Sequence, residues 1–224
     1  IAIGTSRLFG FDLMQNFNFP YFSRDIAEFW RRWHISLSTW FRDYLYIPLG
    51  GSRGGTIMKV RNTFIIFIVS GFWHGANWTF IVWGALNAIY FLPLMLTKNN
   101  RNNIDIVAKG KLLPSLKDFV FIVTTFSLTV FAWIFFRAET IEQAVDITKA
   151  IFSASVFSVP YFKDIELIYP FIPLLILFVL VEWYGRESEY AIEHLFTKKK
   201  KVFRFAFYYL VVAIIFVFAN SGHD

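Results

Sequence analysis

The segment Thr63–Leu96, with the sequence TFIIFIVSGFWHGANWTFIVWGALNAIYFLPLML, decides the fold class of this chain. A helix that crosses a bilayer needs roughly 20 predominantly apolar residues, and this apolar stretch contains 34. We therefore expect the segment to be broken, near Gly71 and Gly75. An irregular break inside a membrane is tolerated only where protein buries it or where it lines a cavity. The sequence thus predicts an all-α, polytopic membrane helical bundle with a broken helix beside a functional site.

The composition of the whole chain supports a membrane protein. Of its 224 residues, 56% are hydrophobic and only 17% are charged, whereas about a quarter of a soluble domain is charged. A soluble domain of this size cannot bury so much apolar surface. The absence of cysteine excludes disulfides, thiolate metal sites and cysteine nucleophiles. The net charge of +6 comes from basic residues that cluster beside apolar segments, which indicates a cytoplasmic membrane face and no nucleic-acid partner.

Three further apolar stretches each fit one crossing: Phe119–Phe136, Leu167–Tyr184 and Val202–Ala219. The connections between them predict sidedness, because cytoplasmic loops carry an excess of lysine and arginine. The basic connections Lys98–Lys117 and Arg186–Arg204 are predicted to be cytoplasmic, and the acidic connection Arg137–Glu166 is predicted to lie outside. The segment quoted above then enters and leaves on the cytoplasmic side.

This topology predicts a depth for His74. The residue follows Asn62 by about 12 positions, or roughly 18 Å of helix. That distance reaches the midplane of a hydrocarbon core about 30 Å thick. A titratable side chain at that depth is a candidate functional residue, and the alternative is a buried histidine that only bonds a backbone carbonyl.

Residues Ser23–Tyr46 are predicted to form an amphipathic helix with Ser23 as its N-cap. On a helical projection the apolar residues share one face: Ile26, Phe29, Trp30, Trp33, Leu37, Trp40, Phe41 and Tyr44. One interpretation is an interfacial helix whose opposite face, with Arg31 and Arg32, meets lipid headgroups. His34 lies at the border of the two faces, where lysine or arginine would reach the headgroups better, so a chemical role is the alternative.

The types of chemistry open to this sequence are few. It contains no HExxH, GxSxG or Walker motif, and two histidines suit acid–base catalysis better than metal binding. We expect no metal site. Four tryptophans are candidates to wall such a site and exclude water: Trp30, Trp33, Trp73 and Trp78. The glycines of Pro48–Gly55 surround Arg53 and form either a phosphate-binding backbone nest or a flexible turn.

Several motifs in this order are similar to those of one known family. They are FWRRWHISLS at Phe29–Ser38, the glycine loop at Tyr44–Gly55, SGFWHG at Ser70–Gly75 and WIFFRAE at Trp133–Glu139. The chain resembles the membrane-bound O-acyltransferase (MBOAT) family over nearly its whole length. The bacterial branch with alginate O-acetyltransferases and the teichoic acid D-alanyl transfer protein resembles it most, and the last motif is similar to a marker of the alginate-type members.

The resemblance implies an enzyme of the bacterial inner membrane, a multi-pass O-acyltransferase in contact with lipid. It implies transfer of an acyl group, most simply acetyl, from a cytoplasmic thioester such as acetyl-CoA, with no bound cofactor. The acceptor would be a hydroxyl of an exported polysaccharide or of a periplasmic acyltransferase partner. The family's catalytic histidine matches His74, as general base, and its second polar position matches His34, as an assisting residue.

Further residues are candidates for donor or substrate binding. Arg31, Arg32 and Arg53 are candidates for the phosphates of the donor, and Trp73 lies within the histidine motif. Asn77 either lines the cavity or bonds a neighbouring helix. Because family members are about twice as long, we expect residues 1–224 to be the C-terminal portion of a single transmembrane domain whose N-terminal helices are missing. The alternative functions are a transporter or flippase subunit and an inactive scaffold of an exopolysaccharide complex.

Overall fold

The computed structural model describes residues 2–154, 158, 165–169, 171–193 and 200–219. The described residues form helices and connecting loops and no strand, which confirms the predicted all-α class. The chain divides into two compact units, Ile1–Ile168 and Tyr169–Asp224. The first unit holds both histidines singled out above.

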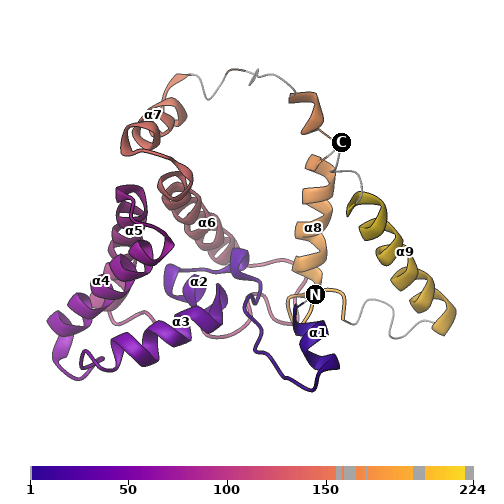
Figure 1. Cartoon of the computed structure of the whole chain (residues 1–224), viewed down its shortest axis with the longest axis horizontal. Helices are drawn as coiled ribbons and strands as arrows, with labels where there is room; N and C mark the ends of the chain where they lie inside the picture. Colours follow the sequence, from indigo (N-terminus) through magenta and orange to yellow (C-terminus); the bar gives the residue numbers. More distant parts are fainter. Residues whose placement is uncertain (1, 155–157, 159–164, 170, 194–199, 220–224) are drawn as a thin grey trace. The chain divides into compact units, whose positions relative to one another are not determined.

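The predicted broken helix is a helical hairpin of two long helices, α4 (Gly55–His74) and α5 (Trp78–Leu96). The two lie side by side in Figure 1 and, among the described helices, form the most extensive pair. The break falls at residues 75–77, and Asn77 caps α5 by accepting a hydrogen bond from the Thr79 backbone N–H at 3.1 Å. The break was therefore correctly predicted at Gly75, whereas Gly71 lies inside α4.

Gly71 and a second glycine let the two helices approach closely. A Cβ atom at Gly71 would lie 2.3 Å from the Phe80 carbonyl oxygen of α5, and one at Gly84 would lie 2.3 Å from the Phe67 carbonyl oxygen of α4. Small residues at such positions allow helix backbones in membranes to pack in direct contact. The glycine contacts are reciprocal, so each helix depends on a glycine of the other.

Helix α4 is longer than the sequence predicted, because it begins at Gly55 rather than at Thr63. Its 20 residues extend roughly 30 Å, which is enough for a complete crossing. The length of α4 is therefore compatible with a complete crossing, and the segment need not turn back at the midplane. His74 is the last residue of α4 and lies at the end farthest from Gly55, and its depth in the membrane stays a prediction.

Helix α6 (Leu116–Arg137) packs against α5 and confirms the predicted span at Phe119–Phe136. Ser115 caps it by accepting a hydrogen bond from the Asp118 backbone N–H at 3.1 Å. Helix α7 (Ile141–Ile151) follows after a short corner and is amphipathic. Within the described residues, three helices are long and apolar enough to cross a membrane, namely α4, α5 and α6. The chain is therefore a multi-pass membrane protein.

The N-terminal region contains α1 (Ala2–Leu8), the short 3-10 helix η1 (Pro20–Phe22), α2 (Ile26–Arg32), α3 (Ile35–Phe41) and the π-helical turn η2 (Arg42–Tyr46). The single helix predicted for Ser23–Tyr46 was wrong in two respects. Its N-cap is Asp25, whose carboxylate accepts from the Glu28 backbone N–H at 2.7 Å. The helix is also interrupted at His34, which has a left-handed backbone conformation with φ 45° and ψ 56°.

The described helices of the second unit are α8 (Phe171–Gly185) and α9 (Lys201–Ala219). Both were predicted as membrane crossings. With 15 residues, α8 is shorter than the roughly 20 that a crossing needs, so this prediction is not confirmed. The crossing predicted for α9 stays a prediction. Within the basic connection that precedes it, residues 194–199 lie outside the described residues.

Candidate active site

A cavity of about 1060 Å³ lies within the first unit, and both His34 and His74 line it. Side chains from α2, α3, α4, α5 and α6 form its walls. Histidines that are 40 positions apart in the sequence therefore face one space.

His74 enters the cavity at the end of α4. Its ring lies edge-on to Trp83 of α5, with centroids 5.4 Å apart, and to Phe136 of α6, with centroids 4.9 Å apart. Within the described residues its imidazole nitrogens have no hydrogen-bond partner, and the residue is exposed. Trp73 also lies against this ring, with centroids 4.9 Å apart. These aromatic contacts hold the plane of the imidazole and leave its nitrogens available to a bound molecule.

His34 is directed into the cavity by the interruption between α2 and α3. Asn16 stabilises this interruption, because its backbone carbonyl accepts from the Ile35 N–H at 2.9 Å and its side chain accepts from the Ser36 N–H at 3.0 Å. The Nδ1 atom of His34 is buried and has no hydrogen-bond partner among the described residues. A buried polar atom without a partner costs stability, so its retention is expected where that atom serves a function.

Aromatic side chains form the wall between the two histidines. Trp30 donates a hydrogen bond from Nε1 to the Asn87 side-chain oxygen at 3.2 Å, and Asn87 in turn donates to the Trp83 carbonyl at 2.8 Å. Trp33 packs against Trp133, with ring centroids 5.4 Å apart. Trp30 and Trp33 line the cavity, as predicted from the sequence.

The other two predicted tryptophans are placed differently. Trp73 and Trp78 are 59% and 74% exposed, and neither is among the described residues that line the cavity. Asn77 also lies outside this lining. Besides capping α5, it donates from its side-chain nitrogen to the Glu139 carbonyl at 2.9 Å, so it has the structural role that was one of its two predicted interpretations.

Cations gather at the opposite end of the cavity from His74. Lys59 is in the second turn of α4, and Lys98 and Arg101 follow the end of α5. We call these three residues the cationic mouth. Within the described residues none of them has a hydrogen-bond or ion-pair partner on its side chain. From the sequence, the basic residues after α5 were predicted only to lie at the cytoplasmic surface. Their position near Lys59 depends on how α4 and α5 pair, which the sequence pattern does not show.

Arg31 and Arg32 were predicted to bind the donor, but neither belongs to the described lining of the cavity. Arg31 donates to the carbonyls of Asn100 and Asn103, at 2.9 and 2.7 Å. These contacts hold the loop after α5, which carries Lys98 and Arg101. Arg31 therefore stabilises the loop that carries two cations of the cationic mouth, without lining the cavity itself. Arg53, the third predicted arginine, is exposed and is likewise not part of this lining.

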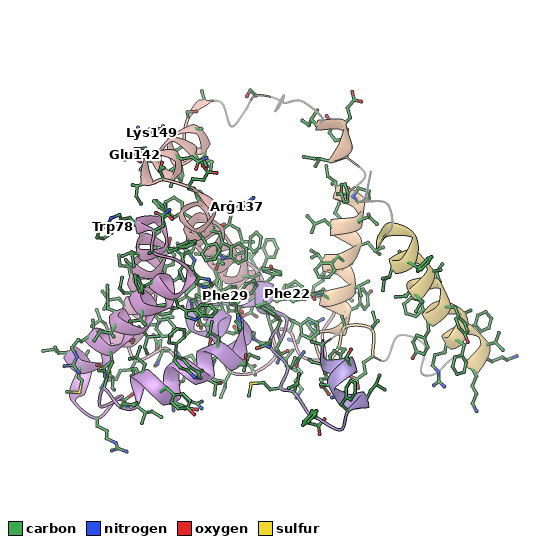
Figure 2. All side chains as sticks on the ribbon, in the orientation of Figure 1. Phe22, Phe29, Trp78, Arg137, Glu142 and Lys149 are labelled. Carbon is green, nitrogen blue, oxygen red and sulfur yellow. The ribbon has the colours of Figure 1, made fainter. Side chains whose placement is uncertain are left out.

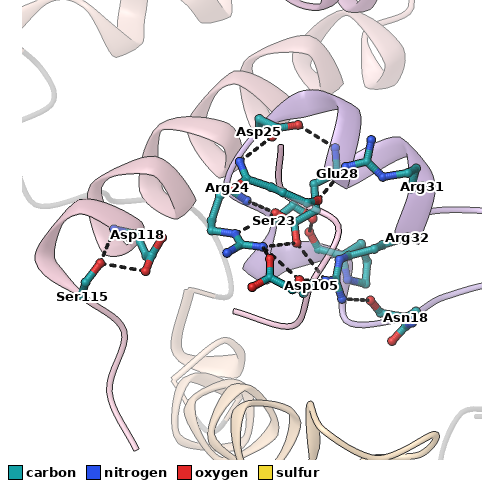
Figure 3. Close-up of polar contacts among 12 residues, drawn as sticks. Asn18, Ser23, Arg24, Asp25, Glu28, Arg31, Arg32, Asp105, Ser115 and Asp118 are labelled. Atoms are coloured by element: carbon teal, nitrogen blue, oxygen red, sulfur yellow. Dashed lines mark hydrogen bonds and ion pairs between the residues drawn. The ribbon is translucent and has the colours of Figure 1, made fainter. Parts of the chain in front are cut away.

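A buried ionic network links α2 to the same loop (Figure 3). Glu28 is 1% exposed and accepts from Arg24 at 3.1 Å and from Arg32 at 2.8 Å. Arg24 also donates to the Asp105 carboxylate at 2.8 Å. On the polar face of the predicted interfacial helix, Glu28 is thus buried and Arg32 partly buried against protein, whereas Arg31 is exposed. Only the spacing of Arg24, Glu28 and Arg32 at four-residue intervals signals the network.

The network shifts two pKa values. Burial of the Arg24 guanidinium lowers its pKa, but hydrogen bonds to Glu28 and Asp105 outweigh burial, and the net pKa is raised above its ordinary value. The hydrogen bond from Arg24 lowers the pKa of Asp105. Both groups therefore remain charged in the folded protein at neutral pH.

Metal chemistry has no ligand set in this region. Among the residues that the structure describes, no group of three or more histidine, aspartate or glutamate side chains is placed to hold a metal ion. The chemistry that the cavity can support is acid–base chemistry by two imidazoles at one end, with anion binding by three cations at the other.

These features define a class: a multi-pass helical membrane protein with an aromatic-walled cavity that joins a cationic mouth to a pair of histidines. Sequence comparison identifies the family within that class. The family model described as MBOAT, membrane-bound O-acyltransferase family, matches residues 1–136. The chain belongs to this family.

Curated relatives support the assignment. The chain is 46% identical over 153 residues to a probable alginate O-acetylase of Pseudomonas aeruginosa, covering 68% of this chain and 27% of that protein. It is 42% identical over 192 residues to a probable alginate O-acetylase of Azotobacter vinelandii, covering 85% of this chain and 36% of that protein. It is 41% identical over 149 residues to a peptidoglycan O-acetyltransferase of Helicobacter pylori, covering 66% of this chain and 27% of that protein. The chain therefore spans about a third of the length of these relatives, or less.

Proposed function

We propose that this chain forms the transfer site of an O-acyltransferase in a bacterial inner membrane. The enzyme moves an acyl group, acetyl in the first instance, from a cytoplasmic thioester to a hydroxyl outside. The acceptor hydroxyl belongs to an exported polysaccharide or to a periplasmic acyltransferase partner. The single observation that carries the proposal is the cavity, which joins the cationic mouth to His34 and His74.

The cationic mouth supports a donor that carries phosphates, such as acetyl-CoA. Lys59, Lys98 and Arg101 present unpaired positive charge among the described residues, and phosphate oxygens form strong charge-assisted hydrogen bonds with such groups. The thioester arm then extends between Trp30 and Trp33 towards the histidines. A wall of this kind excludes water, which limits hydrolysis of a reactive acyl group.

The proposed reaction is a direct acyl transfer. His74 takes the proton from the acceptor hydroxyl while the hydroxyl oxygen attacks the thioester carbonyl carbon. The carbon–sulfur bond then breaks, and the departing thiolate takes up the proton that His74 accepted. His34 donates a hydrogen bond to the carbonyl oxygen as negative charge develops on it. The products are an ester on the acceptor and the free thiol of the donor.

We also propose that residues 1–224 form the C-terminal portion of a single transmembrane domain. The matched region covers only 27–36% of two alginate O-acetylases. Helices from the remainder of such a domain would complete the cavity wall. For that reason the experiments below use the protein at its full natural length.

The first experiment measures thioester consumption in nanodiscs with radiolabelled acetyl-CoA. Candidate acceptors and periplasmic partner proteins are supplied, and wild type is compared with His74→Ala and His34→Ala. Loss of turnover in His74→Ala and a smaller loss in His34→Ala are expected, since general-base catalysis contributes about 10²–10⁴-fold. Trp78→Phe is the matched control, because Trp78 begins α5 close to His74 in the sequence, is 74% exposed and does not belong to the described lining of the cavity. Unchanged turnover in His74→Ala would overturn the mechanism.

A second comparison tests the donor. Replacing Lys98 and Arg101 with glutamine is expected to raise the KM for acetyl-CoA and to weaken its dependence on salt, because screening acts on charged contacts. Lys149→Gln is the control, because Lys149 pairs with Asp146 at 3.3 Å on α7. A wild-type protein that consumes no thioester under any of these conditions would instead favour a transporter subunit or an inactive scaffold.

A further inference from the structure

A second, smaller pocket of about 530 Å³ lies at the end of α6 where the chain turns into α7. Trp133, Arg137, Glu139 and Gln143 are among its lining residues, and two of them, Trp133 and Arg137, also line the main cavity. These two side chains therefore lie between the two spaces. A molecule in the smaller pocket is separated from the histidine cavity only by this partition.

Arg137 carries a positive charge that the described protein does not neutralise. The residue is exposed, and within the described residues its guanidinium has neither a hydrogen-bond nor an ion-pair partner. Acidic side chains are close in the sequence, yet Asp146 pairs with Lys149 at 3.3 Å instead. Figure 2 labels Arg137 at the end of α6 and Glu142 and Lys149 on α7, the next helix along the chain.

The corner that carries Arg137 is held in place by hydrogen bonds. The Glu139 backbone N–H donates to the Gln143 side-chain oxygen at 2.7 Å, and the Asn77 side chain donates to the Glu139 carbonyl at 2.9 Å. Asn77 itself caps α5 immediately after the break that follows His74. A hydrogen bond thus joins this corner to the end of the hairpin that carries His74. The backbone of Arg137 is therefore held in position relative to the site.

The position of Arg137 is close to the reacting end of the main cavity. The preceding residue, Phe136, contacts the His74 ring at 4.9 Å. The cationic mouth lies at the other end of the cavity, near the start of α4 and the end of α5. A donor that enters through the mouth therefore leaves the Arg137 side free for the second substrate.

A structural role explains part of this arrangement. A cation in the last turn of a helix is favoured by the helix dipole, and an arginine at a membrane edge reaches towards headgroups. Neither effect requires the side chain to line two pockets beside a catalytic cavity. An arginine in such a place is well suited to bind a carboxylate, because its planar guanidinium matches that group with two parallel hydrogen bonds.

We infer that the smaller pocket is the acceptor subsite and that Arg137 binds a carboxylate of an acidic sugar acceptor. This inference rests on the proposed acyl transfer. Trp133 presents an aromatic surface held by Tyr21 and Trp33, with ring centroids 6.2 and 5.4 Å away. Glu139 lines the same pocket. Because its carboxylate repels another carboxylate, the hydroxyl groups of the sugar face Glu139 while the sugar carboxylate faces Arg137. The acceptor hydroxyl then points past the partition to His74.

The experiment compares two acceptors that differ only in charge. Full-length protein in nanodiscs is given labelled acetyl-CoA and either an oligouronate or the same oligosaccharide with its carboxyl groups reduced to alcohols. The quantity measured is the ratio of kcat/KM for the acidic acceptor to that for the neutral one. Arg137→Gln is expected to lower this ratio about 10–100-fold, the value of a charge-assisted hydrogen bond, and Arg137→Lys is expected to restore part of it.

Lys149→Gln serves as the control for general loss of positive charge on this side and is expected to leave the ratio unchanged. An equal loss on both acceptors in Arg137→Gln, or no loss at all, would overturn the inference and leave Arg137 with a structural role. Wild-type protein that consumes acetyl-CoA with a partner protein but acetylates neither oligosaccharide would also overturn it. Wild-type protein that consumes no thioester at all would instead show that the proposed function is wrong.

Discussion

The contact between Gly71 of α4 and Phe80 of α5 offers a sharp test of how the hairpin positions His74. A Cβ atom added at Gly71 would lie 2.3 Å from the Phe80 carbonyl oxygen, whereas ordinary contacts begin at 3.4 Å. In Gly71→Ala the two helices must therefore separate by about 1 Å. Overpacking of this kind costs about 1–3 kcal/mol. The sign of the change in unfolding free energy is diagnostic, because alanine in a helix interior is otherwise more favourable than glycine by about 1 kcal/mol.

The same displacement is expected to reduce catalysis. His74 lies on the same helix, three residues after Gly71, and a misplacement of about 1 Å can lower the rate about 100-fold. Gly84→Ala is expected to act alike, because its Cβ would lie 2.3 Å from the Phe67 carbonyl oxygen. Gly4→Ala is the matched control, because Gly4 is helical and has nothing within 4 Å of the added atom.

Two measurements on purified full-length protein check this prediction. The free energy of unfolding is followed by tryptophan fluorescence during denaturant titration in detergent, and thioester turnover is measured in nanodiscs. We expect Gly71→Ala and Gly84→Ala to lose both stability and turnover while Gly4→Ala loses neither. If Gly71→Ala unfolds within about 0.5 kcal/mol of wild type and keeps full turnover, the close approach of α4 and α5 does not position the site.

Two further predictions concern the network of Figure 3. Glu28→Gln is expected to destabilise the protein by about 3–5 kcal/mol, because it leaves the buried Arg24 and the partly buried Arg32 without their shared anion. Asp105→Asn, at a side chain that is 68% exposed, is expected to cost no more than about 1 kcal/mol. Equal losses in denaturant unfolding would contradict the network. Because the pKa of Asp105 is lowered by Arg24, its contribution to stability is present above the unfolded pKa of about 3.9 and is lost as the pH falls through the lower folded value. The difference in unfolding free energy between wild type and Asp105→Asn is therefore expected to stay constant above about pH 5 and to shrink below pH 4, and a difference that grows on acidification would refute this assignment.

Part of the candidate site was predictable because it depends on local sequence. The break after His74 follows from an apolar stretch too long for one helix, and glycine residues flank it. Trp30 and Trp33 were predicted as cavity walls from their type and position, and both line the cavity. The predicted membrane depth of His74, the border position of His34 and the resemblance to the acyltransferase family singled out these two histidines, which share that cavity, and their catalytic roles remain proposals.

Other parts of the site were not predictable, because they depend on contacts between distant segments. Arg31 and Arg32 were expected to bind the donor, but the loop that they hold lies about 70 residues farther along the chain. The cationic mouth combines Lys59 with residues after α5, and only the pairing of α4 with α5 brings them together. No periodicity within a single helix carries this information.

Hydropathy, charge distribution and motif order thus determined the membrane class, the helical hairpin and the identity of the two histidines, because each depends on residues that are near one another in the chain. The tertiary structure decided which cations face the cavity, which arginines are committed to a buried network, and where the backbone turns at His34. Those outcomes depend on the partner that each side chain meets after folding. A polar helix face looks the same in sequence whether it meets water, a headgroup or a distant loop of the same chain.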